Sequence, residues 1–186
     1  MRHGALPPNP ARRFVGQQDV ALSDLGRQQA LLWRQRLVDI PFAAIVSSDL
    51  SRSLDTARLV RGERDIPLIQ ESAFREISLG TWEGLTPHEV EERFPGAYAE
   101  RGKDIAHFRP EGGESFADLA CRVLPAFDKL TSRYAGQPLL IVGHAGVNRV
   151  IIAHWRAIPL GNIFDIPQPY ACGAGTRQSR ITIRNY

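Results

Sequence analysis

Short apolar runs alternate along this chain with segments of helical periodicity, and this alternation limits the folds open to it. The run at 139–142, Leu-Leu-Ile-Val, is the most strand-like and predicts a central strand buried on both faces. Runs at 43–46 and 66–69 predict two further strands, and 181–183 predicts a last one. Strands that alternate with helices favour an α/β domain with a mostly parallel sheet and helices on both faces.

Helices are expected between these strands. Ser23 predicts the N-cap of a helix running to about 38, whose apolar side would be formed by Leu25, Ala30, Leu31 and Leu37. A capping box with proline at the first helical position starts a helix at Thr86, and Ser115 with Asp118 starts another. Two more helices are expected from about 51 to 60 and from 146 to about 157.

The length of 186 residues suits a single domain, 1–186, with a modest insertion. From about 77 to 113 the composition changes to Gly, Glu, Arg and aromatic residues with little apolar periodicity. We expect this segment to be an insertion that covers the functional site. Hydrophobic residues make up 43% of the chain, enough for a core, and no run approaches the length of a membrane span.

The expected setting is a reduced cytoplasm, without a membrane partner. No apolar run follows a basic start, so no secretory signal is visible. Cys121 and Cys172 are the two cysteines and form no CxxC pair, which suggests neither a disulfide framework nor a zinc site. We therefore expect a metal-free protein.

The net charge of +3 has two readings, an ordinary balance of surface charges or attraction for an anionic ligand. Lys103 and Lys129 are the two lysines among 23 basic residues, so arginine dominates. Arginine is the side chain suited to two-pronged contact with phosphate or carboxylate. No basic run with interleaved aromatic residues is present, so no nucleic-acid partner is expected.

Polar clusters follow the predicted strands at their carboxyl ends. Ser47-Ser48-Asp49-Leu50-Ser51-Arg52 follows the run at 43–46, and Gly143-His144-Ala145 follows the run at 139–142 and opens a helix. Arg2-His3-Gly4 would occupy a third such position if a strand preceded it. Loops after parallel strands gather into one crevice, and a helix N-terminus favours an anion there.

Five segments of the chain, in order, carry specific residue patterns. They are Arg2-His3-Gly4 with Asn9 and Gly16-x-x-Asp19-x-x-Leu22-Ser23-x-x-Gly26-x-x-Gln29-Ala30; Ser47-Ser48-x-x-x-Arg52-x-x-x-Thr56-Ala57; Arg75-Glu76-Ile77-x-x-Gly80-x-Trp82-Glu83-Gly84-Leu85-Thr86; Gly112-Gly113-Glu114-Ser115; and Val142-Gly143-His144-Ala145-Gly146. Together, from Arg2 to about Tyr170, the chain resembles the histidine phosphatase superfamily, the phosphoglycerate mutase-like proteins. Five patterns in this order argue against a chance match.

The resemblance implies a role for each matched position. His3 would be the nucleophile that is transiently phosphorylated on nitrogen. Glu76 would donate a proton to the leaving oxygen, with Glu83 as the competing acid. The clamp around the phosphoryl group would comprise Arg2, Arg52 and His144, with Asn9 as a further phosphate or substrate contact. Because the acid must be protonated and the nucleophile unprotonated, a bell-shaped pH profile is expected.

The resemblance also implies the fold and the activity. The fold would be a three-layer α/β/α domain of the phosphoglycerate mutase-like type, in the phosphatase branch of the family. The activity would be hydrolysis of a phosphate monoester of a small metabolite through a phosphohistidine on His3, with no metal or organic cofactor. The alternatives are phosphoglycerate mutase-type phosphoryl transfer and a catalytically silent phosphate-binding module. The oligomeric state stays open, with a homodimer as one alternative.

The chain departs from the family pattern at its N-terminus. Members place an apolar strand directly before Arg-His-Gly, whereas Met1 is all that precedes Arg2 here. We therefore expect the first strand to be missing, which would leave its two neighbours with unpaired backbone groups. Three explanations stay open: a chain cut from a longer one or begun at a misplaced start, which we favour, the terminal part of a fusion, or a real loss. Ala5 also departs from the acidic or amide residue common after this motif.

Overall fold

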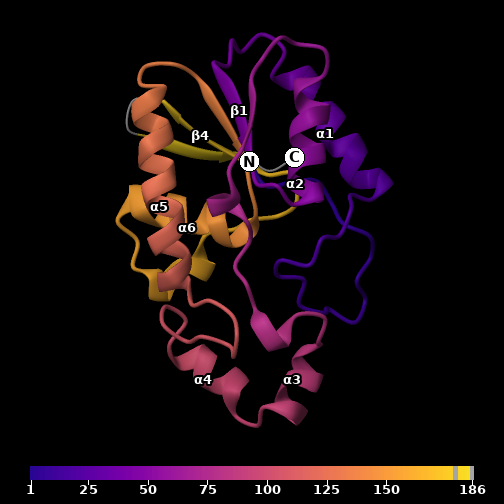
Figure 1. Cartoon of the computed structure of the whole chain (residues 1–186), viewed down its shortest axis with the longest axis vertical. Helices are drawn as coiled ribbons and strands as arrows, with labels where there is room; N and C mark the ends of the chain where they lie inside the picture. Colours follow the sequence, from indigo (N-terminus) through magenta and orange to yellow (C-terminus); the bar gives the residue numbers. More distant parts are fainter. Residues whose placement is uncertain (178–179, 185–186) are drawn as a thin grey trace.

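A computed structural model describes residues 1–177 and 180–184 of the chain (Figure 1). Its main sheet has three parallel strands in the order β2-β1-β3. They are β1 (Ala44–Ser47), β2 (Leu68–Gln70) and β3 (Leu139–Val142). The predicted α/β class and parallel pairing are confirmed. The strand expected at 66–69 begins two residues later than predicted.

Helices cover the sheet on two sides, which makes three layers. In Figure 1, α5 and α6 lie to the left of the sheet, and α1 and α2 lie to the right. Their bounds are α1 Asp24–Arg36, α2 Ser51–Arg61, α5 Phe116–Arg133 and α6 Ala145–Arg156. Alternate side chains of β1 pack against the helices on opposite faces of the sheet. Val46 packs into the largest hydrophobic cluster with α5 and α6, and Ile45 packs with Ala57 of α2. The predicted three-layer arrangement is confirmed.

The prediction that β3 is the central strand, buried on both faces, is wrong. The central strand is β1, in which every residue is buried, whereas Leu139, Leu140 and Ile141 of β3 are partly exposed. The reason lies on the outer side of β3, where Met1 to His3 pair with its end as an isolated bridge rather than a strand. Gly143 N–H donates to the Met1 carbonyl at 2.9 Å, and His3 N–H donates to the Gly143 carbonyl at 3.0 Å.

The same N-terminal residues also pair on their other side. Arg2 N–H donates to the Cys172 carbonyl, and Ala171 N–H donates to the His3 carbonyl, at 2.9 and 3.0 Å. Met1 to His3 therefore bridge the end of β3 and the segment at 171–172. This bridge holds the backbone of His3 in place on both sides.

The apolar side predicted for α1 is wrong in part. Ser23 caps α1 as predicted, because its side chain accepts from Gly26 N–H. The buried side, however, is formed by Gly26, Ala30 and Trp33, while Leu25 and Leu31 are 57% and 41% exposed. A Cβ on Gly26 would lie 2.2 Å from the Ala5 carbonyl oxygen, so glycine lets α1 approach the loop after His3. The close approach at Gly26 and the packing of Ala30 and Trp33 in a hydrophobic cluster together set the orientation of α1.

The segment predicted as an insertion forms short helices. They are η2 (Gly80–Trp82), α3 (Pro87–Arg93) and α4 (Ala97–Lys103), preceded by η1 (Ser72–Phe74). The capping box at Thr86 is confirmed, whereas α4 was not expected. In Figure 1, α3 and α4 form a lobe at the lower end of the molecule. Trp82 is buried, and its ring lies 5.4–6.2 Å from those of Phe14, Tyr98 and Phe108.

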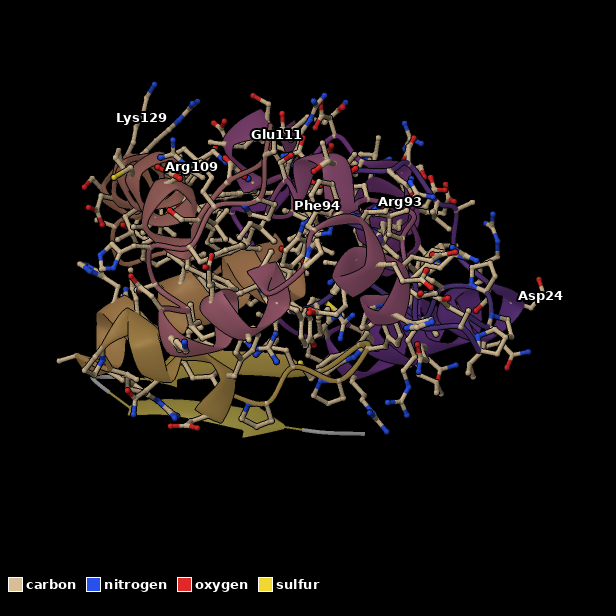
Figure 2. All side chains as sticks on the ribbon, turned by 90° about the horizontal axis from the view of Figure 1, so that it is seen from below. Asp24, Arg93, Phe94, Arg109, Glu111 and Lys129 are labelled. Carbon is tan, nitrogen blue, oxygen red and sulfur yellow. The ribbon has the colours of Figure 1, made fainter. Side chains whose placement is uncertain are left out.

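The remaining elements complete the chain. A 3-10 segment, η3 (Leu160–Asp165), precedes an antiparallel hairpin of β4 (Gly173–Arg177) and β5 (Arg180–Arg184). The strand predicted at 181–183 lies in β5 and is confirmed. Figure 2 views the molecule from the lower end, and the charged side chains of Asp24 and Lys129 project from its edge there. Within the described residues, no helix is long and apolar enough to cross a membrane.

Candidate active site

Two histidines that are 141 positions apart in the sequence meet at the end of β3. The ring centroids of His3 and His144 lie 5.1 Å apart, with an interplanar angle of 60°. His144 is the N-cap residue of α6, and His3 lies on the N-terminal bridge. Both side chains are buried, at 3% and 0% exposure. The structure therefore brings together the two imidazoles that the sequence predicted to converge.

The tautomer of His3 follows from its hydrogen bond. Nδ1 lies 2.8 Å from the Gly4 carbonyl oxygen, and a carbonyl can only accept. Nδ1 must therefore carry the proton, which leaves the lone pair of neutral His3 on Nε2. Burial, followed by the charges of Arg2 and Arg52, lowers the pKa of His3 well below its usual range. The geometry thus provides an uncharged imidazole with a free ring nitrogen.

His144 lies in a similar electrostatic environment. Its Nε2 is 2.7 Å from the Ser48 hydroxyl oxygen. Burial lowers the pKa of His144 well below its usual range, and the positive charges of Arg52 and Arg2 add to this effect. The Nδ1 atom is buried and has no hydrogen-bond partner among the described residues. A buried polar atom of this kind is costly unless a ligand satisfies it.

Arg52 supplies a buried positive charge beside the two rings. It belongs to α2, and its guanidinium donates to the carbonyls of Gln18 and Gly16 at 2.6 and 2.7 Å. These neutral acceptors orient the guanidinium without cancelling its charge. Burial is the main cause that lowers the pKa of Arg52, while the charges of Glu76 and Asp19 act to raise it.

Arg2 supplies a second guanidinium. Its Nη1 donates to the Gln168 carbonyl, and its Cζ lies 3.9 Å from the ring centroid of Tyr170. Its Nε is buried and has no hydrogen-bond partner within the described part of the chain. The charge of Arg2 lowers the pKa of both His3 and His144. Arg2 and Arg52 thus place two cations around the imidazole pair.

The structure gives different surroundings to Glu76 and Glu83, the two carboxylates between which the sequence could not choose a proton donor. The carboxylate of Glu76 accepts from Gly146 N–H at 3.0 and 3.2 Å, at the N-terminus of α6 and two residues after His144. Glu83 Oε1 instead accepts from the N–H groups of Gln17 and Leu79, at 2.9 and 3.1 Å. Glu76 therefore lies beside the histidine cluster, and Glu83 holds a loop.

Asn9 is placed differently from the other predicted residues. It is exposed, its Nδ2 donates to the Arg13 carbonyl at 2.8 Å, and its Oδ1 accepts from Arg13 N–H at 3.0 Å. Both ends of its amide therefore hold its own loop. A phosphate contact by Asn9 stays a prediction, and it would require these bonds to open.

Sequence reasoning did not single out Ser48, Gln168 or Tyr170. Ser48 belongs to a matched pattern and follows β1, so its position at the carboxyl end of a strand could have revealed it. Tyr170 packs against both Arg2 and His3, the latter with ring centroids 5.6 Å apart. No local pattern indicates that contact, because it depends on how the chain returns after η3.

The arrangement suits an anion held at a neutral nucleophile. Two guanidiniums, the buried imidazole of His144 and the N-terminus of α6 provide donors and positive potential. Within the described residues, no group of three or more His, Cys, Asp or Glu side chains is placed to hold a metal ion. Phosphoryl transfer by positioning and electrostatics is the chemistry that such a cluster supports.

Comparison with known proteins agrees with this geometry. The model of the histidine phosphatase superfamily, branch 1, matches residues 1–177. A glucosyl-3-phosphoglycerate phosphatase from Mycolicibacterium vanbaalenii is 36% identical over 169 residues, which span 87% of this chain and 75% of that protein.

Solved structures give the same result. An α-ribazole phosphatase from Shigella flexneri has a TM-score of 0.87 at 27% identity and covers 99% of this chain and 92% of its own. A mycobacterial glucosyl-3-phosphoglycerate phosphatase in complex with VO3 has a TM-score of 0.80 at 31% identity, with 98% and 93% covered. The chain therefore belongs to the histidine phosphatase superfamily, branch 1, and it is a phosphatase.

Proposed function

We propose that this phosphatase hydrolyses a phosphate monoester of a small metabolite through a phosphohistidine formed on Nε2 of His3. The observation that carries the proposal is the state of His3. Its Nδ1 proton is directed at the Gly4 carbonyl, its pKa is lowered, and its Nε2 is free to attack. A protonated imidazole would have no lone pair for phosphorus.

In the first step, Nε2 of His3 forms a bond to phosphorus while the bond from phosphorus to the leaving oxygen breaks. Glu76 donates its proton to that oxygen, and the product alcohol leaves. Such a general acid contributes about 10²–10⁴-fold. The negative charge on the outer phosphoryl oxygens is stabilised by Arg2, Arg52 and His144, and the loss of one such donor costs about 2.7–4 kcal/mol of barrier.

In the second step, water attacks phosphorus and the bond to His3 breaks. The carboxylate of Glu76, left unprotonated by the first step, accepts a proton from the attacking water. Inorganic phosphate leaves, and both residues return to their starting states. No metal or organic cofactor takes part in the proposed cycle.

The proposed substrate is a small phosphorylated metabolite in the cytoplasm, admitted past the insertion at about 77–113. The names of the relatives suggest the first esters to assay, glucosyl-3-phosphoglycerate and α-ribazole 5′-phosphate. Release of inorganic phosphate, measured beside the formation of isomers, separates hydrolysis from mutase-type transfer.

The test compares the wild type with His3→Gln, and uses His88→Gln as a matched control because the His88 side chain is 82% exposed. We expect His3→Gln to abolish turnover and His88→Gln to retain it. Alkaline quenching of the wild type during turnover, followed by mass spectrometry, should find phosphate on the peptide that contains His3. Phosphate release by His3→Gln at the wild-type rate would refute the proposal. Stabilisation by inorganic phosphate without turnover of any ester would favour a silent binding module.

A further inference from the structure

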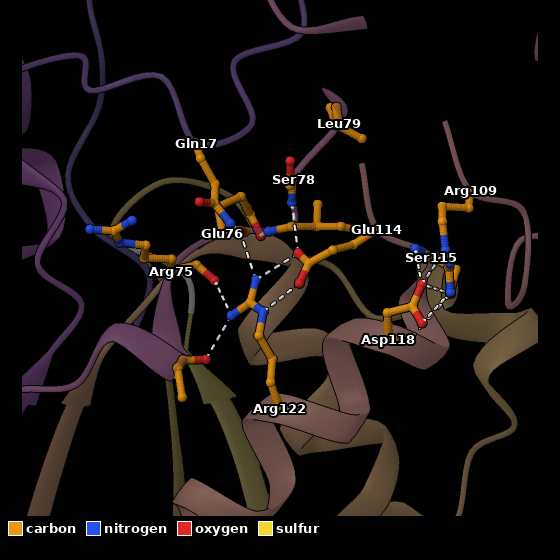
Figure 3. A network of polar contacts seen from close by, with 12 residues as sticks. Gln17, Arg75, Glu76, Ser78, Leu79, Arg109, Glu114, Ser115, Asp118 and Arg122 are labelled. Carbon is orange, nitrogen blue, oxygen red and sulfur yellow. Dashed lines mark hydrogen bonds and ion pairs between the residues drawn. The ribbon is translucent and has the colours of Figure 1, made fainter. Parts of the chain in front are cut away.

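The backbone that carries Glu76 is held by an arginine from another layer of the fold. Arg122 lies in the second turn of α5, and its side chain is 24% exposed. Figure 3 shows its guanidinium pointing at the chain between η1 and η2. It donates to the carbonyl oxygens of Arg75 and Glu76 in that stretch, at 2.9 and 3.0 Å, and to that of Ala73 in η1, at 2.7 Å.

Glu114 holds the other side of the same guanidinium. Arg122 Nε donates to Glu114 Oε1 at 2.6 Å, and Nη2 donates to Oε2 at 2.8 Å. This two-pronged geometry is the strong form of an arginine–carboxylate pair. Burial acts to raise the pKa of Glu114, but Arg122 and the N–H of Ser78 outweigh it, so the pKa is lowered and the carboxylate stays charged.

Together, Arg122 and Glu114 fix the segment on both sides of Glu76. Arg122 donates to the carbonyls of Glu76 and of residues before it. Glu114 Oε2 accepts from the N–H of Ser78, two residues after Glu76, at 2.9 Å. Gln17 Nε2 also donates to the Glu76 carbonyl, at 2.9 Å. The segment lies between two 3-10 turns and belongs to no strand, so these side chains hold it where a sheet would otherwise do so.

The position of Glu76 determines where its carboxyl group can act. A misplacement of about 1 Å in a catalytic group can cost about 10²-fold in rate. The carboxylate reaches Gly146 N–H from a backbone whose carbonyl Arg122 holds, so a shift of that backbone moves the acid relative to His3 and the leaving oxygen. Neither Arg122 nor Glu114 needs to touch the substrate for this effect.

We propose that Arg122, fixed by Glu114, is a positioning residue for Glu76 and controls proton donation to the leaving group rather than the binding of phosphate. The proposal rests on the proposed function, in which Glu76 is the acid. It predicts a specific kinetic signature, because an ester with a good leaving group needs little protonation and an ester with a poor one needs it fully.

The experiment measures kcat/KM for dinitrophenyl phosphate and for an alkyl phosphate. The variants are Arg122→Lys, Arg122→Met and Glu114→Gln, with Glu76→Gln as the reference for loss of the acid. The matched control is Arg109→Gln. Arg109 lies in the same stretch of chain and also forms a two-pronged pair, with Asp118, but its side chain is 61% exposed and the pair lies away from Glu76 in Figure 3.

We expect the Arg122 and Glu114 variants to lose about 10²-fold on the alkyl ester and less than about tenfold on the dinitrophenyl ester. The affinity for inorganic phosphate, measured by calorimetry, should stay within about threefold of wild type, since the donors of the clamp are untouched. Arg109→Gln should match the wild type on both esters. If Arg122→Met does not fold, Arg122→Lys and Glu114→Gln carry the same test.

Equal losses on both esters, or a phosphate affinity that falls in step with activity, would overturn the proposal in favour of a purely structural role. Full activity of the Arg122 variants on the alkyl ester would overturn it as well. Failure of the proposed function has a different signature: Glu76→Gln would then show no dependence on the leaving group, whatever the Arg122 variants do.

Discussion

The two buried imidazoles should make the stability of the protein depend on pH in a way that substitution can remove. Burial is the main cause that holds the pKa values of His3 and His144 well below their usual range. In the unfolded chain both titrate near 6.5. Below that pH the unfolded state takes up protons that the folded state does not, so the free energy of unfolding falls as the pH falls.

The size of the effect follows from the unfolded pKa. Between pH 7.5 and pH 5.5, a histidine that titrates near 6.5 when unfolded and stays neutral when folded lowers the free energy of unfolding by about 1.4 kcal/mol. His3 and His144 together should therefore contribute about 2.7 kcal/mol to the loss. His3→Gln or His144→Gln should remove about half of this pH dependence, and the double variant should remove all of it.

The assay is urea unfolding at both pH values, in buffers that contain no phosphate, because a bound anion would stabilise the folded state. For each variant, the free energy of unfolding at pH 5.5 is subtracted from that at pH 7.5, and these differences are compared. The absolute stabilities are not compared, because the substitutions also change them. Groups common to all variants cancel in this comparison. His88→Gln, at an exposed position, should show the wild-type difference. A double variant that still loses as much stability as the wild type would refute the description of two buried neutral rings.

Three further predictions test other parts of the structure. Arg52→Lys keeps the charge but loses the fork that spans the carbonyls of Gly16 and Gln18, and kcat/KM should fall by about 10²–10³-fold; a loss below tenfold would contradict the clamp. Gly26→Ala should lower the free energy of unfolding, measured in urea, by more than about 2 kcal/mol, because the added Cβ meets backbone atoms. The control Gly102→Ala, in the helix α4, should leave the stability unchanged or raise it by about 0.5–1 kcal/mol. Equal effects of the two substitutions would refute the packing argument. Thr86→Ala should cost about 0.5–2 kcal/mol in the same assay, and no loss would mean that the capping box is not formed in solution.

Elements whose signals are local could be predicted from the sequence. Ser23, Thr86 and Ser115 each accept a backbone N–H at the start of the helix that follows, and this bond needs no partner from elsewhere in the chain. The strands β1 and β3 were also predicted within one residue, because short apolar runs between helices have few other uses in an α/β fold.

Properties that depend on distant partners could not be predicted in the same way. The buried side of α1 combines Ala30 and Trp33 with Gly26, which packs against the backbone of Ala5, and a glycine adds nothing to an apolar pattern. The partial exposure of β3 depends on what lies beside it, and its own residues, Leu139 to Val142, are those of a strand buried on both faces. Hydrophobicity indicates what a segment can bury, and the neighbours decide whether it does.

For the site, the matched patterns supplied His3, His144, Arg2, Arg52 and Glu76, which the structure brings together. Their roles remain the subject of the experiments above. The patterns did not reveal the contacts of Arg122. Its guanidinium binds backbone carbonyls, and the residue types that carry those carbonyls do not indicate such a contact. Any residue offers a carbonyl, so this kind of support becomes visible only in three dimensions.

The same reasoning explains why Glu76 and Glu83 could not be separated by sequence. Each is a glutamate in the same stretch of chain, and they differ in the backbone N–H groups that they accept. Glu83 accepts from Gln17 N–H, and the residues on either side of Gln17 supply the carbonyls that orient Arg52. Glu76 accepts from the start of α6 beside His144. One carboxylate therefore supports the loop that orients Arg52 and the other lies beside His144 at the start of α6, so their different positions arise from backbone geometry and not from residue type.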